Sequence, residues 1–186
     1  MDKRILALIA AIVATSIFGF NHTIAKELMP EVLSPNALLY SRVLGAAICF
    51  WFVSLFTKRE KVEIKDFKLI IICAIFGMGL NMITALNGLY NSTPINSSII
   101  TTLAPIFIFL ISVILLKEKI SKRKYAGVFI GFIGTLTLIL LNEKSLENAP
   151  NINLGNFYLF INSISYALYF VLVKPLTEKY NMITIM

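Results

Sequence analysis

Apolar residues gather in six long blocks along the chain, and short polar segments separate these blocks. A helix needs about 20 residues to cross the hydrocarbon core of a bilayer, and each block approaches or reaches that length. Transmembrane barrel strands are about ten residues long and alternate in polarity, whereas these blocks are continuously apolar. The pattern predicts an all-α, polytopic transmembrane protein. Its six expected spans are Ile5–Ile24, Ala37–Phe56, Leu69–Leu89, Ser98–Leu116, Tyr125–Leu141 and Leu154–Val173.

The composition agrees with a membrane protein and excludes a water-soluble domain. Apolar residues make up 58% of the 186 positions and charged residues 15%, against about 45–50% and about 25% in soluble domains. Lys3 and Arg4 precede the first block as in a signal peptide, but the block runs to Phe20 without a clean cleavage site, which favours a retained signal-anchor helix. Cys49 and Cys73 lie inside spans, and we expect them to be packing residues.

The basic residues predict the orientation of the chain. Fourteen of the seventeen Lys and Arg residues precede span one or follow spans two, four and six, which places them on one side of the membrane. The other side carries Lys26 and Lys144, and Arg42 lies within span two. This positive-inside pattern predicts a multi-pass protein of the inner or plasma membrane with a cytoplasmic N-terminus. The lipid bilayer, and not nucleic acid, is therefore the partner that the net charge of +7 indicates.

The acidic residues argue against two kinds of chemistry. All ten Asp and Glu residues lie outside the predicted spans, whereas many proton-driven carriers relay protons through intramembrane carboxylates. We therefore expect no proton relay that depends on Asp or Glu. The chain also lacks paired carboxylates, metal-ligand clusters and a Ser/His/Asp arrangement, so neither an enzyme nor a metal or cofactor is predicted.

A weak internal repeat suggests how the spans are grouped. Aligning Lys174 with Lys26 places the run Tyr166–Val173 on Phe18–Ala25. Because a unit of five spans has an odd number of crossings, the chain leaves it on the opposite side of the membrane. A second unit therefore enters the membrane from that side, as in many secondary transporters that bind substrate between inverted repeats. The predicted divisions are a first unit at 1–141, an extracytoplasmic linker at 142–153 and the start of a second unit at 154–186.

Three segments resemble the EamA domain of the drug/metabolite transporter superfamily. They are Phe18–Lys26 (FGFNHTIAK), Arg42–Ala47 (RVLGAA) and the stretch from Asn96 to Leu141. The last is the most specific. It combines a polar helix start at Asn96–Ser98, Leu103, Pro105, Glu118 after the helix, and then Gly127, Gly131 and Gly134. Lys117 departs from the family, which often has Gly at that position.

The resemblance implies a secondary transporter with two inverted five-helix units, which moves small metabolites, amino acids or drugs by alternating access, with export as the expected direction. The resemblance covers one unit and the opening of a second. We therefore expect a fragment or short form whose partners are the missing second-repeat helices or another copy, and we expect these 186 residues alone not to transport. The alternative is a membrane scaffold or assembly subunit without transport.

Polar faces on spans three, four and six are candidates for the lining of a substrate cavity. Polar residues in spans tend to face neighbouring helices or water, so packing between helices remains the alternative for any single residue. On each helix the candidates share an arc of about 80–100°. They are Asn81, Thr84, Gly88 and Asn91 on span three, Ser98, Thr101, Thr102 and Pro105 on span four, and Asn162, Ser165, Tyr166 and Tyr169 on span six.

Cationic side chains near the outer ends of spans one and two have two open interpretations each. His22 is the only histidine, and it either contacts substrate or is a hydrogen-bonded structural residue. Lys26 either snorkels or binds an anionic or zwitterionic substrate. For Arg42 we expect snorkelling or a structural pairing, because its match to the family favours a fold-stabilising role over substrate binding.

Three further residues are predicted to have structural roles. Pro105 interrupts the backbone hydrogen bonds of span four, which predicts a kink that can serve as a hinge. Gly127 and Gly131 offer a smooth face for close packing, within the unit or against a second chain.

Overall fold

The computed structural model describes residues 3–29, 31–57, 60–116, 122–141 and 149–185. Within these ranges the chain is helical and contains no strand, which confirms the all-α prediction. Lys117, Glu118, Lys144 and most of the predicted linker 142–153 lie outside the described residues. The elements are α1 (Lys3–Leu28), α2 (Pro35–Ser54), α3 (Ile64–Ala74), η1 (Ile75–Leu80), α4 (Asn81–Asn91), α5 (Pro94–Thr101), α6 (Ala104–Leu116), α7 (Lys122–Leu141), α8 (Ile152–Lys179) and α9 (Met182–Ile185).

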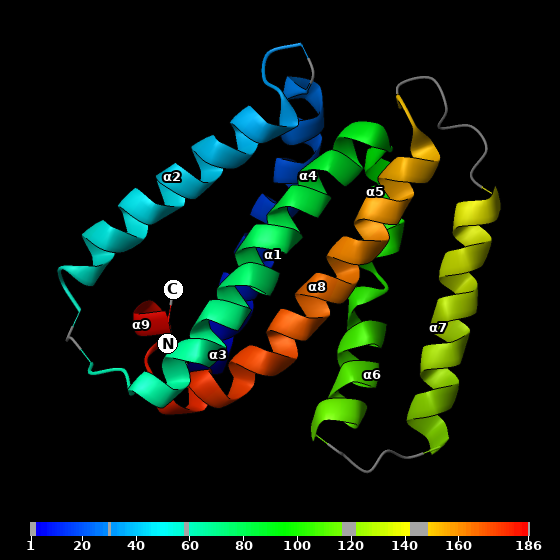
Figure 1. Cartoon of the computed structure of the whole chain (residues 1–186). Helices are drawn as coiled ribbons and strands as arrows, with labels where there is room; N and C mark the ends of the chain where they lie inside the picture. Colours follow the sequence, from blue (N-terminus) through cyan, green and yellow to red (C-terminus); the bar gives the residue numbers. More distant parts are fainter. Residues whose placement is uncertain (1–2, 30, 58–59, 117–121, 142–148, 186) are drawn as a thin grey trace.

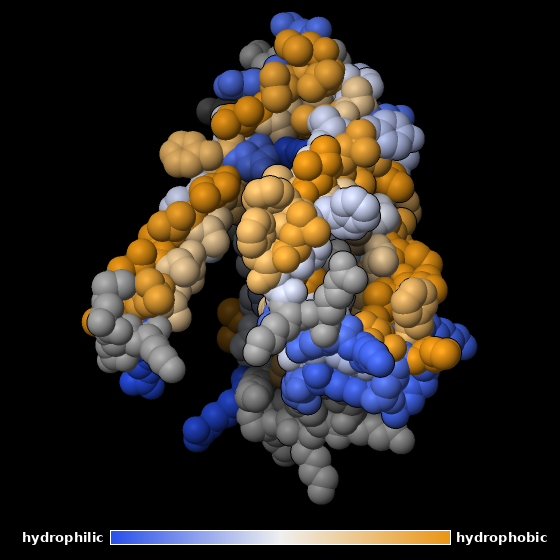
Figure 2. Space-filling model, turned by 90° about the vertical axis from the view of Figure 1, so that its left-hand side faces the viewer, coloured by the Kyte–Doolittle hydropathy of each residue, from blue (hydrophilic) through white to orange (hydrophobic). Residues whose placement is uncertain are grey.

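Five helical runs are long and apolar enough to cross a membrane, and they correspond to five of the six predicted spans. They are Arg4–Leu28, Pro35–Ser54, Ile64–Asn91, Pro94–Leu115 and Ile152–Lys179. The remaining predicted span forms α7, whose described apolar stretch, Tyr125–Thr135, is shorter. Figure 2 shows apolar side chains over the middle of one face and hydrophilic side chains mainly toward its two ends, as expected for a protein surrounded by lipid.

The helix predicted to open a second unit, α8, lies at the centre of the arrangement. It contacts α3, η1 and α4 along one flank and α5 and α6 along the other (Figure 1). The remaining long helices are peripheral, since α1 packs on α4 and α5, α2 on α4 and α9, and α7 on α5 and α6. As a result, α8 joins helices that belong to different parts of the predicted first unit.

Glycines allow α8 to approach its neighbours closely. A Cβ atom at Gly155 would lie 2.6 Å from the backbone nitrogen of Ser92, and one at Gly88 would lie 2.7 Å from Cγ of Leu159. Both distances are too short for any side chain, so these two positions require glycine for packing. On α7 the situation differs, because a Cβ at Gly131 would make an ordinary contact and one at Gly127 would meet nothing within 4 Å.

Two of the spans are not regular α-helices throughout. Span three contains the π-helical turn η1, where the ring of Tyr169 lies against Gly77 and Ser165 Oγ donates a hydrogen bond of 2.7 Å to the carbonyl oxygen of Phe76. A π-helical turn inserts an extra residue into the helix, and such turns frequently adjoin functional sites. The side chains that meet η1 come from α8.

Span four is broken just before its proline. α5 ends at Thr101 and α6 begins at Ala104, since Pro105 has no N–H to continue the hydrogen-bond ladder. At the break, the carbonyl oxygen of Ile100 accepts a bond of 3.0 Å from the Leu103 amide and one of 3.2 Å from the buried hydroxyl of Ser163. The break predicted at this proline is thus present, and α8 supplies a hydrogen bond to it.

A polar cluster holds the loop before α3 against the end of α8. Lys179 Nζ lies 2.5 Å from a carboxylate oxygen of Glu63 and 2.6 Å from one of Asp66. The hydroxyl of Tyr180 donates to Asp66 at 2.7 Å and accepts from the backbone N–H of Glu63 at 3.1 Å. Segments more than a hundred residues apart in the chain are therefore attached at this end of the molecule.

Candidate functional site

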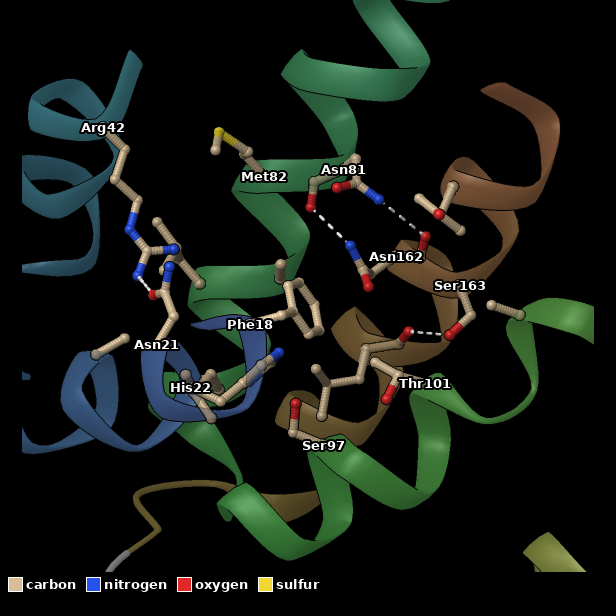
Figure 3. Close-up of a pocket in the computed structure, with 17 residues that line it drawn as sticks. Phe18, Asn21, His22, Arg42, Asn81, Met82, Ser97, Thr101, Asn162 and Ser163 are labelled. Carbon is tan, nitrogen blue, oxygen red and sulfur yellow. Dashed lines mark hydrogen bonds between the residues drawn. The ribbon is translucent and has the colours of Figure 1, made fainter. Parts of the chain in front are cut away.

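A cavity of about 380 Å³ lies between α1, α2, α4, α5 and α8, and Ala104 of α6 also lines it. This volume falls within the range of about 300–1,000 Å³ that is usual for small-molecule sites. Much of the wall is apolar, and polar side chains from all five helices interrupt it (Figure 3). The polar lining residues are Asn21, His22, Arg42, Asn81, Ser97, Thr101, Asn162, Ser163 and Tyr166.

The cavity brings together five of the residues that the sequence offered as candidates for substrate contact. These are His22 from α1, Asn81 from α4, Thr101 from α5, and Asn162 and Tyr166 from α8. Because the five residues come from four helices spread over most of the chain, their convergence depends on the fold. Four further candidates, Lys26, Thr84, Gly88 and Ser98, lie outside the lining and are described below.

Asn81 and Asn162 form a reciprocal pair on one wall. Asn162 Nδ2 donates to the carbonyl oxygen of Asn81 at 2.8 Å, and Asn81 Nδ2 donates to that of Asn162 at 3.4 Å. The pair joins α4 to α8 directly after η1, and Figure 3 shows both amides at the cavity. In a low-dielectric interior such satisfied amides hold two helices together and still present polar atoms to a ligand.

Two buried polar atoms at the cavity have no hydrogen-bond partner among the described residues. They are Nδ1 of His22 and Oγ of Ser97, and Ser97 is completely buried. The His22 ring packs edge-on against Phe18, with 5.0 Å between the ring centroids. Leaving a buried polar group without a partner costs about 1–3 kcal/mol, so both atoms favour a bound molecule that pairs with them.

Arg42 lies at the cavity, and it also pairs with a neighbouring helix. Its guanidinium group donates a hydrogen bond to Oδ1 of Asn21, which comes from α1. Figure 3 shows this pair on the side of the cavity opposite Asn162 and Ser163. None of the lining residues is acidic, so the cavity wall holds a positive charge whose bonded neighbour is a neutral amide.

Lys26 is not part of the cavity lining and instead caps a helix. Its ammonium group donates to the carbonyl oxygens of Leu89, Tyr90 and Ser92 at 2.9, 2.8 and 2.7 Å. These carbonyls stand at the C-terminus of α4, where the helix dipole is negative and carbonyl groups lack partners within the helix. All three donors of the ammonium group are used, which leaves none for a substrate.

The other three predicted residues also lie outside the cavity lining. Thr84 is buried and donates to the carbonyl oxygen of Leu80 in the preceding turn at 2.7 Å. Gly88 is covered by Leu159 from α8. Ser98 is exposed and donates to the carbonyl oxygen of Pro94 at 2.8 Å.

Sequence reasoning missed several lining residues. Asn21 lies in the segment FGFNHTIAK, so its place beside His22 was a usable signal. Ser97 directly precedes the predicted residue Ser98, and Ser163 directly follows the predicted residue Asn162. Both serines fall outside the arcs that we considered. The part of the chain that the structure describes contains no cluster of three or more His, Cys, Asp or Glu residues able to hold a metal ion. Amide, hydroxyl, imidazole and guanidinium groups at an apolar wall are suited to noncovalent recognition.

Comparison with known proteins identifies similar membrane proteins. A model of the EamA-like transporter family matches residues 5–140. An uncharacterized transporter of Archaeoglobus fulgidus is 30% identical over 154 residues, which cover 82% of this chain and 52% of that protein. The uncharacterized transporter YetK of Bacillus subtilis is 26% identical, with 100% of this chain and 56% of YetK covered. A WAT1-related protein of Arabidopsis thaliana is 24% identical, with 84% and 50% covered.

The matches cover only part of each relative. The chain spans about half the length of these curated relatives. No solved structure gives a significant match.

Proposed function

Because the chain belongs to the EamA-like transporter family, we propose that it is a secondary transporter of small metabolites, amino acids or drugs, with its substrate site in the cavity described above. The observation that carries this proposal is the convergence of five predicted polar residues on one cavity that also holds two buried polar atoms without partners among the described residues. A site for noncovalent binding needs no catalytic group, and the relatives are named as transporters, so we assign no enzymatic reaction.

Transport by this site requires alternating access, and we propose that the helix irregularities beside the cavity permit it. η1 ends next to Asn81, and the break before Pro105 adjoins Thr101 and Ala104, which line the cavity. π-helical turns and proline breaks are points where helices bend. Rotation at these points would move the lining residues relative to α8. Export is the direction that the family resemblance favours.

The domain organisation follows from the same proposal. Residues 1–141 form a five-helix unit, 142–153 an extracytoplasmic linker, and 154–186 the opening of an inverted second unit. α8 would then be the second unit's first helix, packed into the first unit. A complete pathway between inverted units needs helices from both, so we expect the 186-residue chain not to transport by itself.

The role of the cavity in transport can be tested by making the same Thr→Leu substitution inside and outside the cavity lining. Thr101 lines the cavity, and its hydroxyl bonds only to a carbonyl of its own helix, so Thr101→Leu blocks the site without breaking a contact between helices. The assay uses the full-length transporter that we propose, meaning this chain together with the remaining helices of the second unit. When it is reconstituted in liposomes and assayed with a panel of amino acids and related metabolites, uptake should fall by about tenfold or more, equivalent to about 1.4 kcal/mol. Thr137→Leu, at an exposed position on α7, is the matched control and should transport normally.

Two outcomes would contradict the proposal. Loss of protein in step with loss of uptake would indicate a packing role for Thr101. Saturable uptake by the 186-residue chain, comparable to that of the full-length transporter, would show that a second unit is not needed. A protein that binds no metabolite in either form would fit the scaffold alternative.

We propose an inner or plasma membrane location with the N-terminus in the cytoplasm, because basic residues dominate one side of the predicted spans. In a Cys49→Ser background, which removes an exposed thiol, single cysteines at Glu31 and Lys61 provide the test, since both positions are exposed. An impermeant thiol reagent should label the cysteine at 31 in intact cells and not the one at 61. The reverse result would invert the orientation.

A further inference from the structure

We propose that the cavity selects substrates that carry a single carboxylate on a largely apolar body, and that Arg42 binds the carboxylate. This inference rests on the proposed transport function and names its substrate class. It assigns Arg42 a role in substrate binding, in place of the fold-stabilising role that the sequence suggested.

The first support is the charge of the cavity wall. Arg42 carries a permanent positive charge, its guanidinium group donates a hydrogen bond to the neutral amide of Asn21, and none of the lining residues is acidic. An arginine with no ion-pair partner among the described residues is costly in a membrane-embedded site. A substrate anion removes this cost. The planar guanidinium group matches a carboxylate with two parallel hydrogen bonds, which an ammonium group does not provide.

The second support is that Lys26, another cationic side chain predicted to contact substrate, already uses its hydrogen-bond donors within the protein. Lys26 donates all three of its protons to carbonyl oxygens at the end of α4. Arg42 bonds through one nitrogen to Asn21 and retains further N–H groups. Between the two side chains, Arg42 is therefore the one able to receive an anion.

The third support concerns the size of the negative charge and the rest of the substrate. A carboxylate carries one charge and balances one arginine, whereas a phosphate monoester carries about −1.5 to −2 near neutral pH. Opposite Arg42 the cavity continues past Phe18 to Asn162 and Ser163, and apolar residues such as Met82 and Leu86 form much of its wall (Figure 3). An apolar body bound at Arg42 would extend over Phe18.

A fourth observation points independently to a ligand. Oγ of Ser97 is completely buried at the same cavity and has no partner among the described residues. Nδ1 of His22 is also a buried atom without a hydrogen-bond partner among the described residues. These two atoms would pair with a polar substituent of the substrate, such as a hydroxyl or amino group, while Arg42 holds the carboxylate.

The test compares acids with their amides, which have the same shape but no charge. The probes are phenylpropionate with phenylpropionamide and isocaproate with isocaproamide, and the readout is the Tm of the purified full-length transporter in detergent. Both acids should raise Tm in a saturable way, and both amides should not. Arg42→Gln should abolish the shift. Arg42→Lys, which keeps the charge but loses the two-bond geometry, should raise the half-saturating concentration by about tenfold.

Arg123→Gln is the matched control, because it removes an exposed arginine from α7, a helix that contributes no residue to the cavity lining. Its acid-dependent shift should equal that of the wild type. If Arg42→Gln does not fold, the comparison of acid with amide in the wild type and in Arg42→Lys decides the question.

Equal stabilisation by acid and amide would overturn the inference and leave the proposed binding cavity intact. The same holds if Arg42→Gln keeps the full response. A larger shift with phenyl phosphate than with phenylpropionate would overturn the choice of carboxylate. The absence of any shift with all probes, together with no transport of the metabolite panel, would overturn both the inference and the proposed function.

Discussion

The two helices equated by the internal repeat, α1 and α8, occupy very different environments. Among the described side chains, α1 buries a single residue, Ala25, whereas α8 buries eight. The buried positions of α8 are Gly155, Leu159, Asn162, Ser163, Ser165, Ala167, Val171 and Leu176. Similar apolar segments can therefore serve as a central or a peripheral helix. The difference lies in the small and polar residues of α8, which allow close contacts with several neighbours at once.

The largest expected difference between the two helices comes from removing a large side chain. Leu159 on α8 is 1% exposed and packs with Ile100 and Leu103, whereas Ile17 on α1 is 62% exposed. Leu159→Ala should lower the free energy of unfolding by about 2–5 kcal/mol, as is typical of buried leucines. Ile17→Ala should change it by less than about 0.5 kcal/mol. Denaturant unfolding in mild detergent measures both, and equal losses would remove the distinction between the helices.

A second comparison uses glycines on the same two helices. A side chain at Gly155 would collide with backbone atoms of Asn91 and Ser92, which cannot rotate away, whereas one at Gly19 would have nothing within 4 Å. Gly155→Val should therefore destabilise by about 1–3 kcal/mol, the usual cost of overpacking. Gly19→Val should be tolerated in the 186-residue chain. If Gly19→Val is tolerated there but destabilises the full-length transporter, α1 packs against second-unit helices.

A smaller effect should follow from the attachment of α1 to α4 at the C-terminal end of α1. Lys26→Met leaves the carbonyl oxygens of Leu89, Tyr90 and Ser92 without the ammonium group. We expect a loss of about 1–2 kcal/mol in stability, below the upper range for hydrogen bonds to charged groups because the site is partly exposed. Lys68→Met, at an exposed position on α3, is the control. A loss of transport without a loss of stability would instead support substrate binding by Lys26.

The case of Lys26 also shows where prediction from the sequence ends. The spans could be predicted because long apolar runs have few alternatives in a bilayer. Asn81, Thr101 and Asn162 could be found because polar residues on an apolar helix tend to face inward. The role of Lys26 could not be predicted, since its partners are backbone carbonyls more than sixty residues away, and a sequence shows nothing about which backbone atoms remain unpaired.

The residues around α8 illustrate the same limit in another form. The predicted arc on this helix contained Asn162 but not Ser163, because a helix was expected to present one face to the cavity. α8 is surrounded by other helices, so polar residues on several of its faces find partners, as Ser163 does at Ile100 and Ser165 at Phe76. A central position of this kind depends on packing between distant segments, and the polarity pattern of one helix does not reveal it.

The smallest expected effect concerns pH and the attachment of the far end of α8. Hydrogen bonds from Lys179 and then Lys65 lower the pKa of Glu63 below its ordinary value of 4.5. A carboxyl whose pKa is lower in the folded state stabilises the fold above its unfolded-state pKa, and this contribution is lost as the pH falls through the folded-state value. Tm should therefore decrease as the pH is lowered below about 4.5, and the decrease should be smaller in Glu63→Gln. Because Glu63 is exposed, the effect should be slight and should shrink at high salt.

The control is Glu178→Gln, which removes an exposed carboxylate from the same end of α8. If this variant reduces the pH dependence of Tm as much as Glu63→Gln does, the pH dependence does not come from the attachment of α8 to the loop before α3.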